Sequence, residues 1–182
     1  MHVHGADGLH AGVDSVTKNL LLYWGESKIY EGASDAIREC LASLAPMLRS
    51  DENGSSPADR DIQLLQRFAD VDDPELETAF KRFLDPRTDA SACVEFRGLC
   101  LVGFDCSHYP MDAGKTELSA VVEGIKTLRP SLIKQIANRI AAERLDPFGI
   151  HFFCVPFPST KEFTARLLVE LGLADGGTNG TS

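Results

Sequence analysis

The stretch "NLLLYWGESKIYEG", residues 19–32, decides the fold because it carries an apolar strand directly into a pair of charged residues. Its aliphatic and aromatic first half is typical of a buried β-strand. Residues two apart on a strand share a face, so Glu26 and Lys28 project to the same side as Trp24. The two charges lie at the C-terminal end of the strand, where sheets usually open to ligands. We therefore interpret this end of the strand as a candidate site.

The segments around this strand alternate between extended and helical patterns. Residues 1–10 and 19–30 predict a β-hairpin whose polar turn, residues 11–18, is centred near Val16. After the hairpin, an amphipathic helix is predicted over residues 37–48 with Ser34 as its N-cap, followed by short helices at 62–68 and 76–83. Residues 92–109 predict a long strand or a hairpin bent at Gly98, and helical stretches follow over 118–125 and 132–140, with Pro130 opening the second. The last predicted elements are a strand from 148 that Pro156 stops and a helix over 159–173 with Ser159 as N-cap and Glu162 in a capping box. This order predicts an α/β fold in which a mixed β-sheet is flanked by helices.

Length and composition predict one globular domain. With 182 residues, of which 43% are apolar and 25% charged, the chain is long enough for one core. We place that domain at residues 1–173, with a helical insertion at about 49–90, and expect residues 174–182 to form a disordered tail. Five cysteines without a C-x-x-C pair or a secretory segment predict reduced, mostly buried thiols in a cytoplasmic protein. No apolar run is long enough to cross a bilayer, so we expect no membrane partner.

The net charge limits the possible partners. A formal charge of −9 repels nucleic acid at long range, which counts against a stand-alone nucleic-acid binder. It does not exclude an enzyme to which a basic partner delivers DNA, because net charge does not describe one local groove.

Asp7 is predicted to lie opposite Glu26, so that the two carboxylates form a pair. A turn near Val16 sets Asp7 opposite Glu26, and facing carboxylates are unfavourable unless a positive group lies between them. A divalent cation resolves that repulsion, and Mg²⁺ takes one or two carboxylates together with waters and phosphate oxygens. We predict Asp7, Glu26 and the carbonyl of Ser27 as metal ligands. Lys28 is the predicted catalytic lysine, which orients or deprotonates the attacking water, and a neighbouring cation should lower its pKa. The predicted reaction class is metal-assisted phosphodiester hydrolysis.

The order of these motifs resembles a known superfamily. An aspartate on one strand, Glu-x-Lys on the next and then a helix is the pattern of PD-(D/E)xK (restriction-endonuclease-like) nucleases. The motifs "GADGLH", "YWGESKIY", "SDAIREC" and "FFCVPFPSTKEF" resemble the family of HamA, the nuclease subunit of Hachiman antiphage defence, over residues 1 to about 173.

The resemblance implies a function and partners. It matches Glu26 and Lys28 to the catalytic pair and Asp7 to the upstream acid, with Mg²⁺ or Mn²⁺ as cofactor. It also implies DNA as substrate and a helicase partner, HamB, that loads the DNA. The superfamily's first helix has no counterpart before the hairpin, so either more chain or a partner is expected to supply that surface.

The same residues have plainer interpretations. Glu-x-Lys arises by chance about once in a chain of this length, and a surface ion pair at a strand end is the structural alternative. Asp7 followed by Gly8 is also an ordinary turn signal. A catalytically inactive module of the same fold, which binds nucleic acid or a helicase, is therefore the alternative function.

Other motifs carry less weight. "HVHG", residues 2–5, resembles the His-x-His of amidohydrolases, but those enzymes are barrels of about 250 residues. Cys100, Cys106 and His108 fit no common zinc spacing, so we predict buried thiols there. His10 is predicted to be a solvent histidine near the turn and not a phosphate contact. Two further sets are predicted to be core and solvated surface, respectively: Phe152, Phe153, Phe157 and Phe163, and Lys126, Arg129, Lys134 and Arg139.

Overall fold

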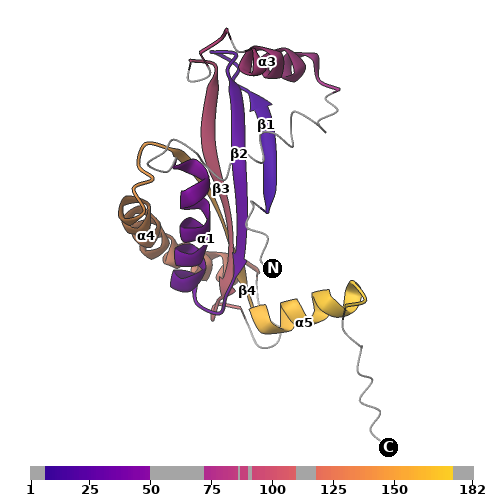
Figure 1. The fold of residues 1–182 in the computed structure, drawn as a ribbon. Coiled ribbons are helices and arrows are strands. Elements are labelled where there is room, and N and C mark those ends of the chain that lie inside the picture. The colour runs from indigo at the N-terminus through magenta and orange to yellow at the C-terminus, as the bar shows by residue number, and fades with distance from the viewer. Residues whose placement is uncertain (1–6, 50–71, 86, 90–91, 110–117, 174–182) are drawn as a thin grey trace, which may run out of the picture.

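A mixed four-stranded sheet organises the part of the chain that the computed structural model describes, which is residues 7–49, 72–85, 87–89, 92–109 and 118–173 (Figure 1). The strands lie in the order β1 (Gly8–Val13), β2 (Leu20–Ile29), β3 (Val94–Asp105) and β4 (Gly149–Phe157). β1 pairs antiparallel with β2, whereas β2 pairs parallel with β3 and β3 parallel with β4. This arrangement confirms the predicted mixed sheet.

Helices flank the sheet and make the parallel connections, which confirms the α/β class. The described helices are α1 (Ala33–Leu48), α3 (Pro74–Leu84), α4 (Leu118–Ala142) and α5 (Thr160–Glu170). α1 packs against β2 and β3, and α4 lies beside α1 (Figure 1). α3, which falls within the predicted helical insertion, contacts β1 and β2. Among the described residues, no helix is both long enough and apolar enough to cross a membrane.

The hydrophobic core lies between the sheet and α1. Leu20, Leu22 and Trp24 alternate along β2 toward one face and are fully buried. Ile37 and Leu41 of α1 pack in the same core cluster. The next residue on this face of β2 is Glu26, so the apolar stripe runs directly into the candidate site.

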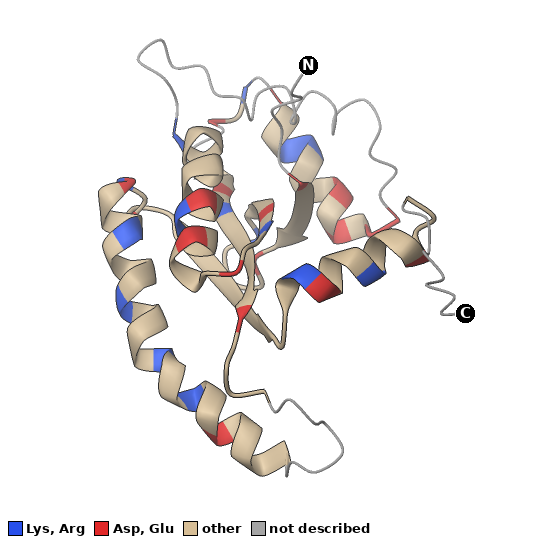
Figure 2. Ribbon diagram, turned by 90° about the horizontal axis from the view of Figure 1, so that it is seen from below, with Lys and Arg blue, Asp and Glu red and all other residues tan. Residues whose placement is uncertain are grey.

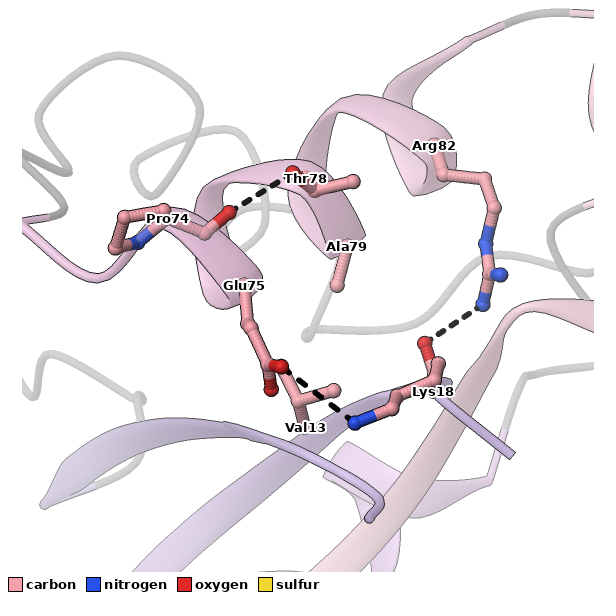
Figure 3. Close-up of a pocket in the computed structure, with 7 residues that line it drawn as sticks. All are labelled: Val13, Lys18, Pro74, Glu75, Thr78, Ala79 and Arg82. Atoms are coloured by element: carbon pink, nitrogen blue, oxygen red, sulfur yellow. Dashed lines mark hydrogen bonds and ion pairs between the residues drawn. The ribbon is translucent and has the colours of Figure 1, made fainter. Parts of the chain in front are cut away.

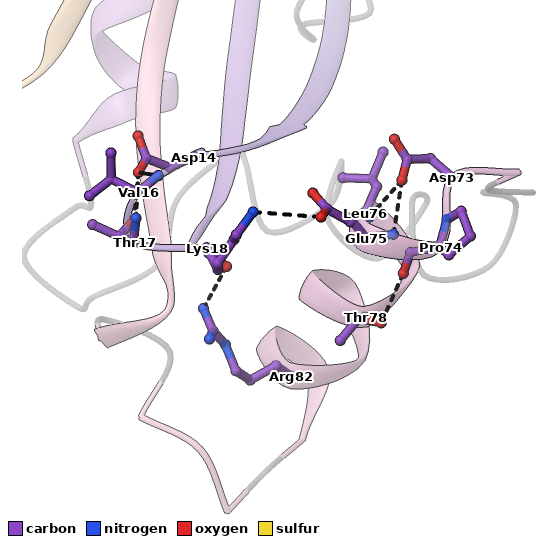
Figure 4. A network of polar contacts seen from close by, with 10 residues as sticks. All are labelled: Asp14, Val16, Thr17, Lys18, Asp73, Pro74, Glu75, Leu76, Thr78 and Arg82. Carbon is purple, nitrogen blue, oxygen red and sulfur yellow. Dashed lines mark hydrogen bonds and ion pairs between the residues drawn. The ribbon is translucent and has the colours of Figure 1, made fainter.

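The hairpin turn is centred where the sequence predicts it, but β1 is shifted. β1 extends to Val13, three residues into the predicted turn, and the turn itself covers residues 14–19. Asp14 closes the turn, because its carboxylate accepts hydrogen bonds from the N–H of Val16 and from the N–H and hydroxyl of Thr17 (Figure 4). This side-chain turn, and not the end of the apolar pattern, sets where β1 ends.

Gly98 does not bend a hairpin, contrary to one predicted alternative. β3 is one continuous strand through this position. A Cβ atom at Gly98 would collide with the side chain of Leu44 in α1 and lie 2.8 Å from Ile150 in β4. The glycine therefore allows the helix to approach the sheet closely, and a packing requirement explains it better than a turn does.

Two prolines lie inside elements that they were predicted to delimit. α4 is one helix through Pro130, not two stretches, and Pro130 lies on its exposed side while Leu132, Ile136 and Ile140 pack against the core. β4 continues through Pro156 to Phe157. β4 is an edge strand of the described sheet, where a missing N–H is tolerated.

The helix caps agree with the sequence at one end of the chain and differ at the other. Ser159 caps α5 by accepting from the N–H of Glu162, as predicted. α1 begins at Ala33, two residues earlier than a Ser34 N-cap implies, and its N-cap is Gly32. Asp35 in the first turn of α1 offers a negative charge to the helix N-terminus. The predicted helix at 62–68 and the tail at 174–182 lie outside the described residues.

Most side-chain environments follow the predictions. All five cysteines are free thiols, and four of them are buried. Phe152 packs against the core as predicted, but Phe153 is 56% exposed on the sheet face opposite α1, so its assignment to the core was wrong. Phe157 and Phe163 are half-buried outside the core cluster and stack with ring centroids 4.5 Å apart. The basic residues of α4 lie along its length (Figure 2), and Lys126, Arg129 and Lys134 are exposed, as predicted.

Candidate functional site

The predicted residues lie together at the C-terminal end of β2. Gly8 pairs with Gly25 in the antiparallel register, so Asp7 immediately precedes β1 in line with Glu26. Lys28 follows Glu26 on the same face of β2. The site is therefore assembled from two adjacent segments, which is the arrangement predicted from the hairpin.

Glu26 and Lys28 form a partly buried ion pair. Nζ of Lys28 lies 3.0 Å from Oε2 of Glu26, and the two side chains are 26% and 5% exposed. The thiol of Cys40, on α1, donates to the main-chain carbonyl of Glu26 at 3.4 Å. Sequence reasoning placed Cys40 on the buried face of α1 but missed this contact, which ties the helix to the strand at the site.

Burial perturbs both members of the pair. It raises the pKa of Glu26 above its ordinary value, and the hydrogen bond from Lys28 only partly opposes this effect; the charge of Asp7 adds to it. Burial alone would lower the pKa of Lys28, but the hydrogen bond and charge of Glu26 outweigh it and raise that pKa. The pKa of Lys28 was predicted to be lowered by a bound cation. The neighbour that the structure shows is the carboxylate of Glu26, which shifts the pKa of Lys28 in the opposite direction.

Asp7 is held by Ser27. Oδ2 of Asp7 accepts from the N–H of Ser27 at 2.8 Å and from its hydroxyl at 2.7 Å. Burial raises the pKa of Asp7, but these two hydrogen bonds and the charge of Lys28 together outweigh burial and hold the pKa below its ordinary value. The N–H and C=O of one strand residue point to the same side, so the carbonyl of Ser27 faces the β1 edge as well.

The donor set fits a hard divalent cation. Asp7 and Glu26 offer carboxylate oxygens, and the negative charge of Asp7 adds to the burial that raises the pKa of Glu26. No three His, Cys, Asp or Glu side chains of the described residues form a group that could hold a metal ion. Mg²⁺ does not need such a group, because one or two carboxylates suffice when waters and substrate oxygens complete the shell.

The weaker candidates lie elsewhere. His10 is exposed within β1 and pairs with Tyr23, so it projects to the sheet face opposite Glu26. Cys100 is buried, and its hydrogen bond with Cys40 followed by burial raises the pKa of its thiol. Such a thiol is a poor ligand and a poor nucleophile. The motif "HVHG" lies outside the described residues.

A pocket of about 270 Å³ lies at the opposite end of β2, between the hairpin turn and α3 (Figure 3). Its charged groups are engaged within the chain: Lys18 pairs with Glu75 at 3.5 Å, and Arg82 donates to the carbonyl of Lys18 at 2.9 Å (Figure 4). These contacts hold the turn against the helix, and Lys18 adopts a left-handed φ of 58° there. We assign this pocket to packing between the two elements and not to the candidate site.

The raised pKa of Glu26 predicts a pH dependence of stability. A carboxyl whose native pKa lies above its unfolded value, about 4.3, stabilises the fold fully below that value and loses the contribution as pH rises through the native pKa. In EDTA, Glu26→Gln should therefore gain stability relative to the wild type as pH increases from 4 to 8. Urea unfolding at several pH values measures the difference. If the stability of Glu26→Gln relative to the wild type stays constant, or falls as pH rises, the assignment is contradicted.

A protein-family model described as HamA matches residues 1–171. No curated protein and no solved structure matches the chain.

Proposed function

The chain belongs to the HamA family and is a component of Hachiman antiphage defence, and from this premise we propose that it is a metal-dependent endonuclease that hydrolyses DNA. The observation that carries the proposal is the convergence of Asp7, Glu26 and Lys28 at the C-terminal end of β2. Lys28 lies 3.0 Å from Glu26, and the negative charge of Asp7 acts on both. The mixed sheet with its flanking helices is consistent with a restriction-endonuclease-like fold.

Each residue has a defined role in this proposal. Asp7, Glu26 and the carbonyl of Ser27 hold Mg²⁺ or Mn²⁺, which when bound offsets negative charge on the scissile phosphate. Lys28 is held in place by Glu26 and orients the attacking water or accepts its proton. The core residue Trp24 and the thiol of Cys40 fix the strand that carries Glu26.

DNA is proposed to reach the site through a partner. The net charge of −9 gives the chain little long-range attraction for phosphate, so a helicase subunit is the proposed source of DNA affinity. Basic residues lie along α4 (Figure 2), and Lys126, Arg129 and Lys134 are exposed there, although Lys126 also pairs with Glu123 at 2.7 Å.

The proposal predicts metal-dependent cleavage. We expect the chain, together with its helicase partner, to nick or linearise plasmid DNA in Mg²⁺ or Mn²⁺ and to lose this activity in EDTA. Agarose gel analysis measures the conversion, and the partner alone is the control for contaminating nucleases. Absence of cleavage with both metals, with and without the partner, would refute the enzymatic proposal.

A second candidate is an inactive module that binds nucleic acid or the helicase. One observation favours it: the carboxylates of Glu26 and Asp7 already have partners within the chain, in Lys28 and Ser27. This candidate expects no metal-dependent cleavage and no binding of Mn²⁺, so the same preparation distinguishes the two.

A further inference from the structure

Ser27 contacts the carboxylate of Asp7 with two donors that converge on one oxygen. The main-chain N–H and the hydroxyl of Ser27 lie 2.8 and 2.7 Å from Oδ2 of Asp7. Because the last described β1–β2 pair is Gly8 with Gly25, Ser27 lies just beyond it along β2. This clasp fixes the carboxylate relative to the strand that carries Glu26.

We propose that Ser27 is a positioning residue whose side chain orients Asp7 so that Oδ1 is presented to the divalent cation. The inference rests on the proposed function, because it requires that a cation binds here. Both donors use Oδ2, which leaves Oδ1 outside the clasp. A ligand oxygen that is already oriented binds a metal without the cost of immobilising its side chain.

The serine side chain thus has a role separate from the metal-binding carbonyl of the same residue. Bonds from a donor to an ionised carboxylate are short and about twice as strong as neutral ones. Partners that orient a metal ligand typically change metal affinity by about 10–100-fold when they are removed. The hydroxyl is the removable half of the clasp, since the N–H remains in every variant except proline.

The test compares variants that differ only in this hydroxyl. Threonine and valine have the same shape and both suit a strand, so Ser27→Thr and Ser27→Val share any steric effect. We expect Ser27→Val to bind Mn²⁺ about 10–100-fold more weakly than Ser27→Thr by isothermal titration calorimetry. In an Asp7→Asn background the same pair should differ little, because Ser27 acts through Asp7.

The chain contains a matched control at the other end of β2. Thr17 contacts Asp14 in the same way, with its N–H at 2.7 Å and its hydroxyl at 3.0 Å from one oxygen, Oδ1 (Figure 4). Ser27 lies seven positions after Leu20, about 23 Å along β2. Thr17→Val should therefore leave the affinity for Mn²⁺ unchanged.

The outcomes separate this inference from the proposed function. If the wild type binds Mn²⁺ and Ser27→Val binds it equally well, the clasp is only a cap on the strand edge and the inference is wrong. Melting temperatures in EDTA then report that structural role. If the wild type itself does not bind Mn²⁺, the metal-dependent function fails, and the inference fails with it.

Discussion

Glu26→Gln is expected to lower the rate of DNA cleavage by at least about 10²–10³-fold while the protein remains folded. Glutamine keeps the size of the side chain and one of its oxygens, but it removes the negative charge that would hold the cation. The buried position strengthens the effect, since a side chain that is 5% exposed has little water to replace the lost interaction. Initial rates over a titration of Mg²⁺ measure the loss, which saturating metal should not restore.

The neighbouring strand supplies the control for this variant. Glu95 and Arg97 on β3 have the same acid-x-base spacing and form an ion pair of 2.8 Å, but Glu95 is exposed. Glu95 pairs with Leu21, which places it on the sheet face opposite Glu26. Glu95→Gln should cleave DNA at the wild-type rate. Equal activity of the wild type and Glu26→Gln would show that the reaction does not use this carboxylate.

Glu26→Gln is expected to raise stability in EDTA and to lower the rate of cleavage, and both effects come from the loss of the same buried charge. The carboxylate is expected to cost stability in EDTA because burial disfavours its charged form, and to be required for cleavage because that charge binds the cation. A cation bound only by the wild type should stabilise it by about 2.7 kcal/mol at a concentration one hundred times its Kd. This stabilisation should reverse the order of stability of the two proteins. A variant that is more stable without metal and inactive with it is the combined signature of the site.

The elements of the fold were predictable because their patterns are local. Strand β2, helix α1 and the cap of α5 follow from spacing and capping residues that lie close together in the sequence. The wrong interpretations were the hairpin alternative at Gly98 and the breaks at Pro130 and Pro156, since the usual local meaning of these residues is a bend or a stop; the long strand, the other alternative at Gly98, is confirmed. In each case the tertiary structure overrides the local pattern. Gly98 leaves space for the side chain of Leu44, and core contacts keep the second half of α4 in line with the first. Pro156 lies on an edge strand, where its missing N–H is tolerated.

The positions of the site residues were predictable from the periodicity of the strands. The two-residue repeat of β2 places Glu26 and Lys28 together, and the hairpin centre places Asp7 in line with Glu26. The contacts that hold these groups were not predictable. The bond from Ser27 to Asp7 depends on where β1 begins, and the bond from Cys40 to Glu26 depends on how α1 packs. Both depend on side-chain geometry between separate elements, which one sequence does not encode in any local pattern.

Lys28→Met is the second large effect, with an expected loss of about 10²–10⁴-fold in the rate of cleavage. Methionine keeps the unbranched stem but removes the ammonium, which neither orients water nor exchanges a proton any longer. The variant also leaves the buried carboxylate of Glu26 without its partner at 3.0 Å, so we expect the free energy of unfolding at neutral pH to fall by about 1–3 kcal/mol. Lys81→Met is the control, because Lys81 forms a comparable pair with Glu77 at 2.6 Å on exposed α3.

Lys28→Arg separates the two roles that Lys28 can have. Arginine keeps the positive charge next to Glu26, and so most of the stability, but its guanidinium does not lose a proton in the range of the assay. If Lys28 accepts the proton of the attacking water, Lys28→Arg should be nearly as inactive as Lys28→Met, and the wild-type rate should rise with pH while the residual rate of the arginine variant does not. If Lys28 only orients water by its charge, the arginine variant should keep a substantial part of the activity and the wild-type pH profile. Activity in Lys28→Met equal to that in the wild type would remove Lys28 from the reaction altogether, because no other described cation lies as close to Glu26.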